Sequence, residues 1–250
     1  MEIKMDSLTW QEFNERKKDS VVILPIGSLE QHGPHLPLCT DKVIAYELAL
    51  LLAKEVNGIV APPINYGYKS LPASGGGPLF PGTIDLNGAT VVSLVKDILE
   101  EFVRDGVKKI VIFNSHYENE AFILEAADLV SRNIKDDTKI LITNWWDPLS
   151  QETVDKVFDE VPFPGWALEH AAITETSFML KFTPELVHME RLVDESMTPP
   201  GYSIYPIPKD LVPPSGLLAT AKSSSKEKAD IMIEEIIPTL KNIIEKEFNK

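Results

Sequence analysis

The sequence predicts an α/β fold, a single domain in which a mainly parallel β-sheet is flanked by α-helices. Through the first 146 residues, short apolar runs rich in Val and Ile alternate with longer segments whose apolar residues recur at helical spacing. Strands that alternate with helices in this way pair in parallel and are covered by those helices. No change in composition divides the 250 residues, so we expect one domain over residues 1–250.

The predicted elements of this first part follow one another in a regular order. The first strand (SVVILPI) is apolar throughout and ends at Gly27, as a strand buried on both faces would. One helical pattern ends just before Gly106, and glycine is the residue type usual just past a helix end. The predicted strands cover residues 20–26, 58–61, 108–114 and 139–145, and the predicted helices cover residues 41–56, 89–105 and 119–133.

The remaining segments are less regular. Residues 62–88 are rich in glycine and proline but contain several aromatic residues, which favours an ordered functional loop. Residues 169–182 are predicted to be helical, and the proline-rich residues 196–216 to form an extended arm on the surface. Ser224 and Glu227 have the capping-box spacing that opens a last helix over 225–247, which Pro238 is expected to kink.

The charge of the chain excludes several classes of partner. With 24 Lys and Arg against 38 Asp and Glu, the formal net charge is −14, the wrong sign for a protein that binds nucleic acid or an anionic membrane surface. No apolar stretch approaches the ~20 residues that cross a bilayer. The single cysteine, Cys39, cannot form an internal disulfide, which fits a reducing compartment. We therefore expect a cytoplasmic protein.

Two short motifs carry the chemistry, and each follows a predicted strand. Glu30 and His32 come after the first strand, and His116 and Glu118 come after the strand at 108–114. Ligands of open parallel sheets bind at the carboxyl ends of the strands. In extended chain, residues two apart point to the same side, so each motif offers an imidazole and a carboxylate. With Asp41 as a further carboxylate, these ligands suit two divalent ions such as Zn²⁺ or Mn²⁺.

Other interpretations of these residues are open at this point. A single Glu-x-His is more often part of a solvated loop than a ligand pair. Only with the second copy does a metal site become about as probable as a solvated loop. Asp41 could simply cap the helix that follows it. The three glycines at 75–77 are not followed by Gly-Lys-Ser/Thr, so they form neither a phosphate-binding loop nor a dinucleotide fingerprint.

Five segments, in this order and spacing, resemble the creatininase family: LPIGSLEQHGPHLPLCTD, YGYKSLPASGGGPLFPGT, NSHYENE, NWWD and GWALEHAAITETS. The resemblance covers nearly the whole chain. It implies one metal held by Glu30, Asp41 and His116, and a second held by His32, Asp41 and Glu118, with Asp41 bridging. One metal is typically zinc in this family, and the other is exchangeable and often manganese. The family also implies a homo-oligomer, usually a hexamer.

The resemblance further implies a substrate site and an activity, the interconversion of creatinine and creatine. In such a site, two metal ions would lower the pKa of a shared water, and the resulting hydroxide would attack the lactam carbonyl. His170 is the candidate acid for the leaving ring nitrogen, and Glu118 could shuttle the proton. Glu175 matches an acidic residue near the catalytic histidine. The positions that match substrate contacts or the covering flap are Ser74, Tyr117, Trp146, Trp166 and His170.

Departures from the family pattern keep the substrate open. Ala167 stands where an acidic residue is usual, and Ala171 and Ala172 replace two glycines. One alternative is a relative that acts on another amide, such as the formamide of a formylaminopyrimidine nucleotide. A nucleotide phosphate would need Arg or Lys, and the loop and flap segments supply only Lys69. A more remote alternative is a non-catalytic metal-binding module, which would need neither His170 nor an aromatic flap.

Overall fold

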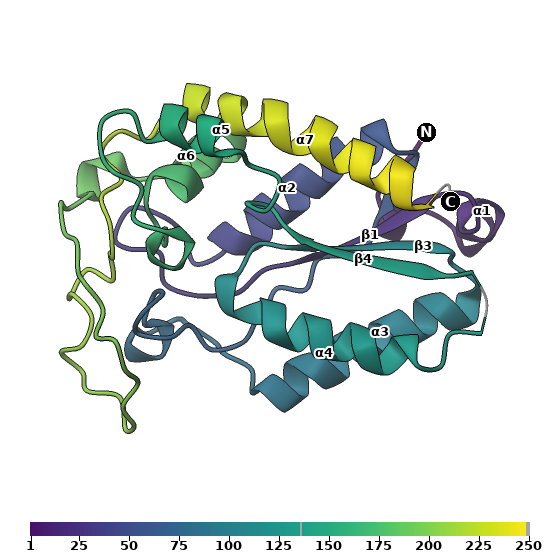
Figure 1. Cartoon of the computed structure of the whole chain (residues 1–250), viewed down its shortest axis with the longest axis horizontal. Coiled ribbons are helices and arrows are strands. Elements are labelled where there is room, and N and C mark those ends of the chain that lie inside the picture. The colour runs from purple at the N-terminus through teal and green to yellow at the C-terminus, as the bar shows by residue number, and fades with distance from the viewer. Residues whose placement is uncertain (136, 249–250) are drawn as a thin grey trace.

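The computed structural model describes residues 1–135 and 137–248 and is built around a four-stranded parallel sheet (Figure 1). The strand order is β2-β1-β3-β4, so the first strand lies in the middle of the sheet. Ile23 pairs with Val60 on one side and with Val111 on the other. The strands are β1 (Val21–Ile26), β2 (Gly58–Val60), β3 (Lys109–Asn114) and β4 (Lys139–Asn144). The predicted α/β fold with a parallel sheet is confirmed.

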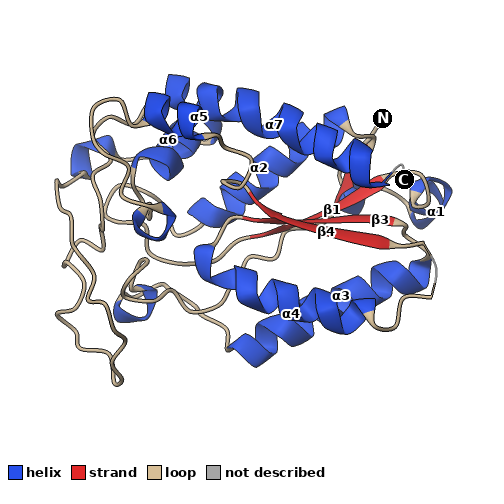
Figure 2. Ribbon diagram, in the orientation of Figure 1, coloured by secondary structure: helices blue, strands red, loops and turns tan. Residues whose placement is uncertain are grey.

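Helices cover both faces of the sheet (Figure 2). One face is covered by α3 (Gly88–Asp105) and α4 (Glu120–Ser131), which pack on each other. The opposite layer contains α2 (Thr40–Glu55), α5 (Gln151–Val157), α6 (Ile173–Phe182) and α7 (Lys226–Phe248). A further short helix near the N-terminus, α1 (Trp10–Arg16), begins with a capping box between Thr9 and Glu12.

Alternation along the strands divides the core into two layers. Val21 and Ile23 of β1 face the cluster that contains α2, α6 and α7, whereas Val22, Leu24 and Ile26 face the cluster under α3 and α4. Successive side chains of a strand point to opposite faces, so a strand covered on both sides must be apolar throughout. This is why β1 is buried at all six positions.

Several predicted boundaries need correction. The helix expected from residue 169 begins at Ile173, and residues 169–172 form an irregular turn before it. The last helix begins at Lys226 and runs through Pro238, and the side chain that accepts from its first turn belongs to Ser225, not Ser224. The short helices α1 and α5 were not expected, because seven residues give too few turns for a clear apolar period.

The loops gather at one end of the sheet, where the strands end (Figure 1). The proline-rich residues 196–216 form an extended arm at this end, as predicted; about half of its residues are exposed, whereas Val212 and Gly216 are buried. Within residues 1–135 and 137–248, no helix combines the length and apolar character needed to cross a membrane.

Candidate metal and active site

The two predicted motifs meet at the carboxyl ends of β1 and β3. Glu30 and His32 lie on the loop after β1, and His116 and Glu118 follow β3 directly. Asp41 is the second residue of α2, and it is buried between the two motifs rather than acting as a cap, since Cys39 occupies the cap position. Adjacent parallel strands that end at one edge therefore bring together residues more than 70 positions apart in sequence.

The first group of potential ligands contains Glu30, Asp41 and His116. His116 Nδ1 lies 2.7 Å from Glu30 Oε1 and 3.2 Å from Asp41 Oδ2. All three residues are buried, and their ligand atoms lie within 4.8 Å of one another, which is the spacing needed to hold one metal ion.

The second group contains His32, Asp41 and Glu175, so Asp41 belongs to both. His32 Nε2 lies 2.9 Å from Asp41 Oδ1 and 3.5 Å from Glu175 Oε2. The resemblance implied Glu118 as the third member here. In the structure, Glu175 is the carboxylate that joins His32 and Asp41 in a buried group of ligand spacing.

Backbone carbonyls fix which nitrogen each imidazole turns towards these carboxylates. His116 Nε2 lies 2.9 Å from the Tyr68 carbonyl, and His32 Nδ1 lies 3.2 Å from the Glu30 carbonyl. A carbonyl only accepts, so each of these nitrogens carries a hydrogen. The opposite nitrogens, His116 Nδ1 and His32 Nε2, are left to face the carboxylates. A metal-ligating histidine is usually oriented in this way.

Glu118 lies at the edge of the same cluster. Its Oε1 accepts hydrogen bonds from the Leu71 amide at 2.7 Å and from the Ser74 hydroxyl. Its Oε2 lies 3.4 Å from His116 Nε2 and has no hydrogen-bond partner in the described part of the chain. One oxygen is thus held in place while the other remains available.

The cluster has the composition expected of a cation site. Buried polar atoms without a hydrogen-bond partner are rare in folded proteins. Here, among the described residues, Glu30 Oε2, His32 Nε2, Asp41 Oδ2 and Glu118 Oε2 all lack one. The ion-pair partners of these carboxylates in residues 1–135 and 137–248 are imidazoles, never Lys or Arg. Buried carboxylates in excess require cations, so these residues fit divalent metal ions.

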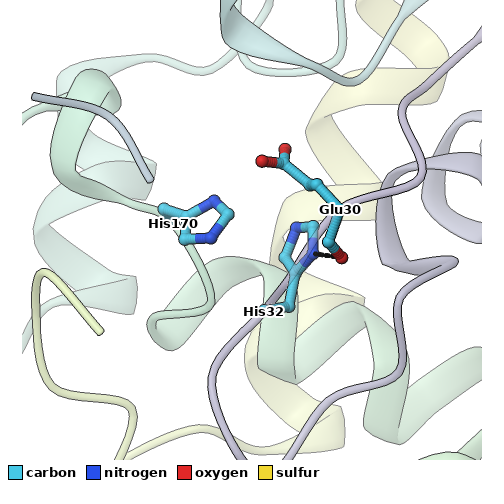
Figure 3. Close-up of side chains that lie close together, drawn as sticks. All are labelled: Glu30, His32 and His170. Atoms are coloured by element: carbon cyan, nitrogen blue, oxygen red, sulfur yellow. Dashed lines mark hydrogen bonds between the residues drawn. The ribbon is translucent and has the colours of Figure 1, made fainter. Parts of the chain in front are cut away.

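His170 approaches the cluster from the turn before α6 (Figure 3). Its ring stacks on that of His32, with centroids 4.4 Å apart, and one of its nitrogens is within ligand spacing of Glu30 and His32. Ala171 has φ +54°, a left-handed conformation that reverses the chain here. Glu175 Oε2 accepts a 2.6 Å hydrogen bond from the Ala171 amide, so this turn positions both His170 and Glu175.

A small cavity opens beside the cluster, and aromatic rings form its outer wall. The Trp146 and Trp166 rings are nearly parallel, with centroids 6.3 Å apart, and Tyr117 lies 6.1 Å from Trp146. The fully buried Trp145 supports both tryptophans through edge-to-face contacts. The predicted site residues that line the cavity are Glu30, Asp41, Ser74, His116, Tyr117, Glu118, Trp146, Trp166, His170 and Glu175.

Known proteins are similar to this chain over most of its length. The family model described as creatinine amidohydrolase matches residues 6–244. The creatinine amidohydrolase of Pseudomonas putida is 37% identical over 248 residues, which cover 96% of this chain and 95% of that protein. This chain belongs to the creatininase family. It is a hydrolase of the creatinine amidohydrolase type.

Solved creatininase structures agree with this assignment. A creatininase mutant complexed with creatine and a manganese form each match with a TM-score of 0.95 at 36% identity, and a Zn–Zn form of a mutant matches equally well at 35% identity, each over 100% of both chains. A protein named for another substrate is also similar to this chain. A 3-dehydro-scyllo-inosose hydrolase of Thermotoga maritima is 26% identical over 97% of this chain and 82% of its own length.

Three further residues line the cavity of this family member but had no predicted role, namely Ser115, Trp145 and Glu169; Ala167, noted above as a departure from the family pattern, lines it too. Glu169 is buried and accepts hydrogen bonds from the backbone amide and the hydroxyl of Thr174, which ties the turn around His170 to the start of α6. Sequence patterns placed Glu169 inside a helix and therefore could not show that its carboxylate caps one. His35, on the loop after β1, is buried with its Nε2 2.9 Å from the Thr176 hydroxyl.

The metal-free protein is expected to lose stability as the pH rises above about 7. Burial alone would lower the pKa of His32, but the carboxylates of Asp41, Glu175 and Glu30 raise it from 6.5 to about 10. Burial raises the pKa of Glu175 from 4.5 to about 8. Both groups therefore keep protons that the unfolded chain has released, and each such proton lowers the free energy of unfolding by ~1.4 kcal/mol per pH unit.

The measurement is the melting temperature of metal-stripped protein between pH 7 and 9.5. It should fall by several degrees, because ~1 kcal/mol corresponds to about 2–4 °C in a chain of this size. Saturating zinc should flatten the profile, since cations then replace the protons. A melting temperature that rises with pH in the stripped protein would contradict the prediction.

Proposed function

We propose that this chain hydrolyses the lactam amide of creatinine to give creatine, and catalyses the reverse reaction as well. The observation that supports this most strongly is the pair of ligand groups that share Asp41 and border a small aromatic-walled cavity. The 37% sequence identity to the Pseudomonas putida creatinine amidohydrolase, over 96% of this chain, supports the same substrate.

The proposed cofactors are two divalent metal ions per subunit, zinc with manganese or a second zinc. Glu30, Asp41 and His116 would hold one, and Asp41 with His32 would share in holding the other. Either Glu118, as the resemblance implies, or Glu175, as the side-chain positions favour, would complete the second set. When bound, such ions supply an activated water and polarise the substrate carbonyl.

The protein's own residues would bind and orient the substrate. Creatinine is small, planar and partly cationic, and the faces of Trp146 and Trp166 offer it flat, electron-rich surfaces. Tyr117, whose side chain is 44% exposed, lies at the rim where it can contact a ligand. Ser74 also lines the cavity, and its hydroxyl donates a hydrogen bond to Glu118.

The reaction needs a group that carries a proton from the water to the ring nitrogen, and Glu118 is the proposed carrier. Hydrolysis adds the water oxygen to the carbonyl carbon, breaks the bond from carbon to the ring nitrogen, and moves one water proton to that nitrogen. Glu118 Oε2 lies without a hydrogen-bond partner among the described residues, while Oε1 is anchored. Burial raises the pKa of this carboxyl to about 7, near the value that suits a proton carrier. His170 and Glu175 are the other proposed catalytic residues.

The cavity favours creatinine over the formylaminopyrimidine nucleotide. A phosphate is bound by Arg, Lys or the amides of a helix N-terminus. Among the described residues that line the cavity, none is Lys or Arg, whereas five are Asp or Glu. A nucleotide phosphate would therefore find no Lys or Arg in this lining, whereas a small neutral or cationic ligand needs none. We also propose a homo-oligomer, with the hexamer as the expected form.

Creatine formation from creatinine by metal-stripped and reloaded protein tests the proposal. Stripped protein should be inactive, and zinc plus manganese should restore turnover in the ordinary enzymatic range of about 1–10³ s⁻¹. Metal content per chain is measured on the same samples. A formylaminopyrimidine, which carries a formamide, and cyclic amides other than creatinine serve as comparison substrates.

The outcomes separate the metal site from the substrate. Two bound metals with no creatinine turnover would overturn the substrate proposal and leave the dinuclear site. A single metal at full activity would overturn the dinuclear site. Metal binding without turnover of any amide would favour a non-catalytic module.

A further inference from the structure

Gln31 stands between two proposed metal ligands, but its side chain turns away from them. It is buried, and its Nε2 lies 2.7 Å from the Gly75 carbonyl, 3.0 Å from the Gly216 carbonyl and 2.9 Å from His170 Nε2. Its Oε1 accepts a 2.8 Å hydrogen bond from the Gly33 amide. One amide group therefore joins the glycine loop, the end of the proline-rich arm and His170.

These backbone contacts settle which way round the Gln31 amide lies. The two carbonyls can only accept, so the group that faces them must be the NH₂. The Gly33 amide can only donate, so the group that faces it must be the oxygen. In the flipped orientation, the amide oxygen would meet two carbonyl oxygens, and the NH₂ would meet an N–H.

The orientation of Gln31 decides the tautomer of His170. An NH₂ group has hydrogens but offers no acceptor, so an Nε2–H on His170 would place two donors 2.9 Å apart. His170 Nε2 must then be an acceptor, which shares the two NH₂ hydrogens with the Gly75 and Gly216 carbonyls, and the proton of the ring resides on Nδ1. The stacking of His170 on His32 restricts rotation of the ring out of this position.

We propose that Gln31 is a positioning residue, which holds His170 with Nε2 as acceptor and its proton on Nδ1, so that His170 serves the reaction as a hydrogen-bond donor. The catalytic half of this statement rests on the proposed function. An imidazole in this form polarises a carbonyl or steadies a developing charge by donation, and is a poor source of a whole proton. The proton for the leaving ring nitrogen then comes from Glu118, which has taken it from the attacking water.

A second residue controls the same contact. Gly216 has φ +79°, and a Cβ built on it would lie 2.1 Å from Gln31 Oε1. Any side chain at position 216 must therefore displace the Gln31 amide. This gives two independent variants, Gln31→Met, which removes the donor, and Gly216→Ala, which leaves the donor present but moves it.

The test is the ring-nitrogen NMR spectrum of zinc-loaded protein labelled with ¹⁵N-histidine, because Zn²⁺ is diamagnetic. The chain has 5 histidines, so the His170 signals can be assigned with a His170→Gln variant. The wild-type spectrum should show Nδ1 protonated and Nε2 bare. Both variants should shift His170 toward the Nε2–H form, and kcat should fall ~10–100-fold, as for other outer-shell substitutions, with KM little changed. Gln151→Met, at an exposed glutamine on α5, is the matched control.

Each outcome decides the proposal. An Nε2–H signal for His170 in the wild-type protein would overturn it without any variant. An unchanged tautomer or an unchanged kcat in a folded Gln31→Met protein would also overturn it. If the Gln31→Met protein does not fold, the same two measurements are made on the Gly216→Ala protein. The spectrum is independent of turnover, so failure of creatinine as substrate would leave the assignment of Gln31 standing.

Discussion

Asp41→Asn is expected to abolish turnover by releasing both metal ions at once. Asp41 belongs to both ligand groups, with one oxygen 2.9 Å from His32 Nε2 and the other 3.2 Å from His116 Nδ1. Asparagine keeps the size of the side chain but has one neutral oxygen and an NH₂ that cannot ligate a cation. The loss of affinity should exceed the ~10–100-fold typical of outer-shell partners, because a shared ligand is removed.

Metal content and the zinc-induced rise in melting temperature measure this effect directly. Zinc at 100 times its dissociation constant stabilises a folded protein by about 2.7 kcal/mol, which is several degrees here. The variant should show neither this shift nor activity. Asp97→Asn, at an exposed position on α3, is the matched control and should behave as wild type. Two metals retained at full occupancy in the variant would remove Asp41 from the bridging position.

The sequence was sufficient for the sheet and for the place of the site. Buried parallel strands are continuous apolar runs, so β1 and β3 were recognisable, and the residues after them had to meet at one edge. The strands are also short and bounded by Gly, Asn or Asp, which kept the errors at their ends to one residue or so. The fold itself is that of the creatininase structures.

Contacts between segments that are distant in sequence could not be predicted from the sequence patterns. Glu175 reaches His32 because the turn at 169–172 interrupts the apparent helix, and that turn depends on the positive φ of Ala171, where glycine would be the ordinary signal. The sequence also contained no indication that the Gln31 amide would contact His170, which lies 139 positions further along the chain. Both features are set by tertiary packing rather than local pattern.

Glu118→Gln is expected to reduce turnover by about 10²–10⁴-fold, the usual contribution of a positioned proton carrier, while leaving the fold intact. Glutamine can keep one contact of Glu118, since its amide oxygen can still accept from the Leu71 amide that now lies 2.7 Å from Oε1. It cannot take up and return a proton. Glu120→Gln, two residues further on and exposed at the start of α4, changes the same charge outside the cavity and is the control.

The metal content of the Glu118→Gln protein then decides whether Glu118 or Glu175 is the third ligand of the second metal. If Glu118 is that ligand, occupancy should drop towards one ion per chain, and turnover would fall for two reasons. If Glu175 supplies it, two ions should remain, and the loss of turnover reports the proton alone. Glu175→Gln should show the reverse pattern, because its carboxylate lies 3.5 Å from His32 Nε2 and 2.6 Å from the Ala171 amide. Full activity in Glu118→Gln would exclude Glu118 from the reaction and leave the proton transfer to another buried carboxylate of the cavity.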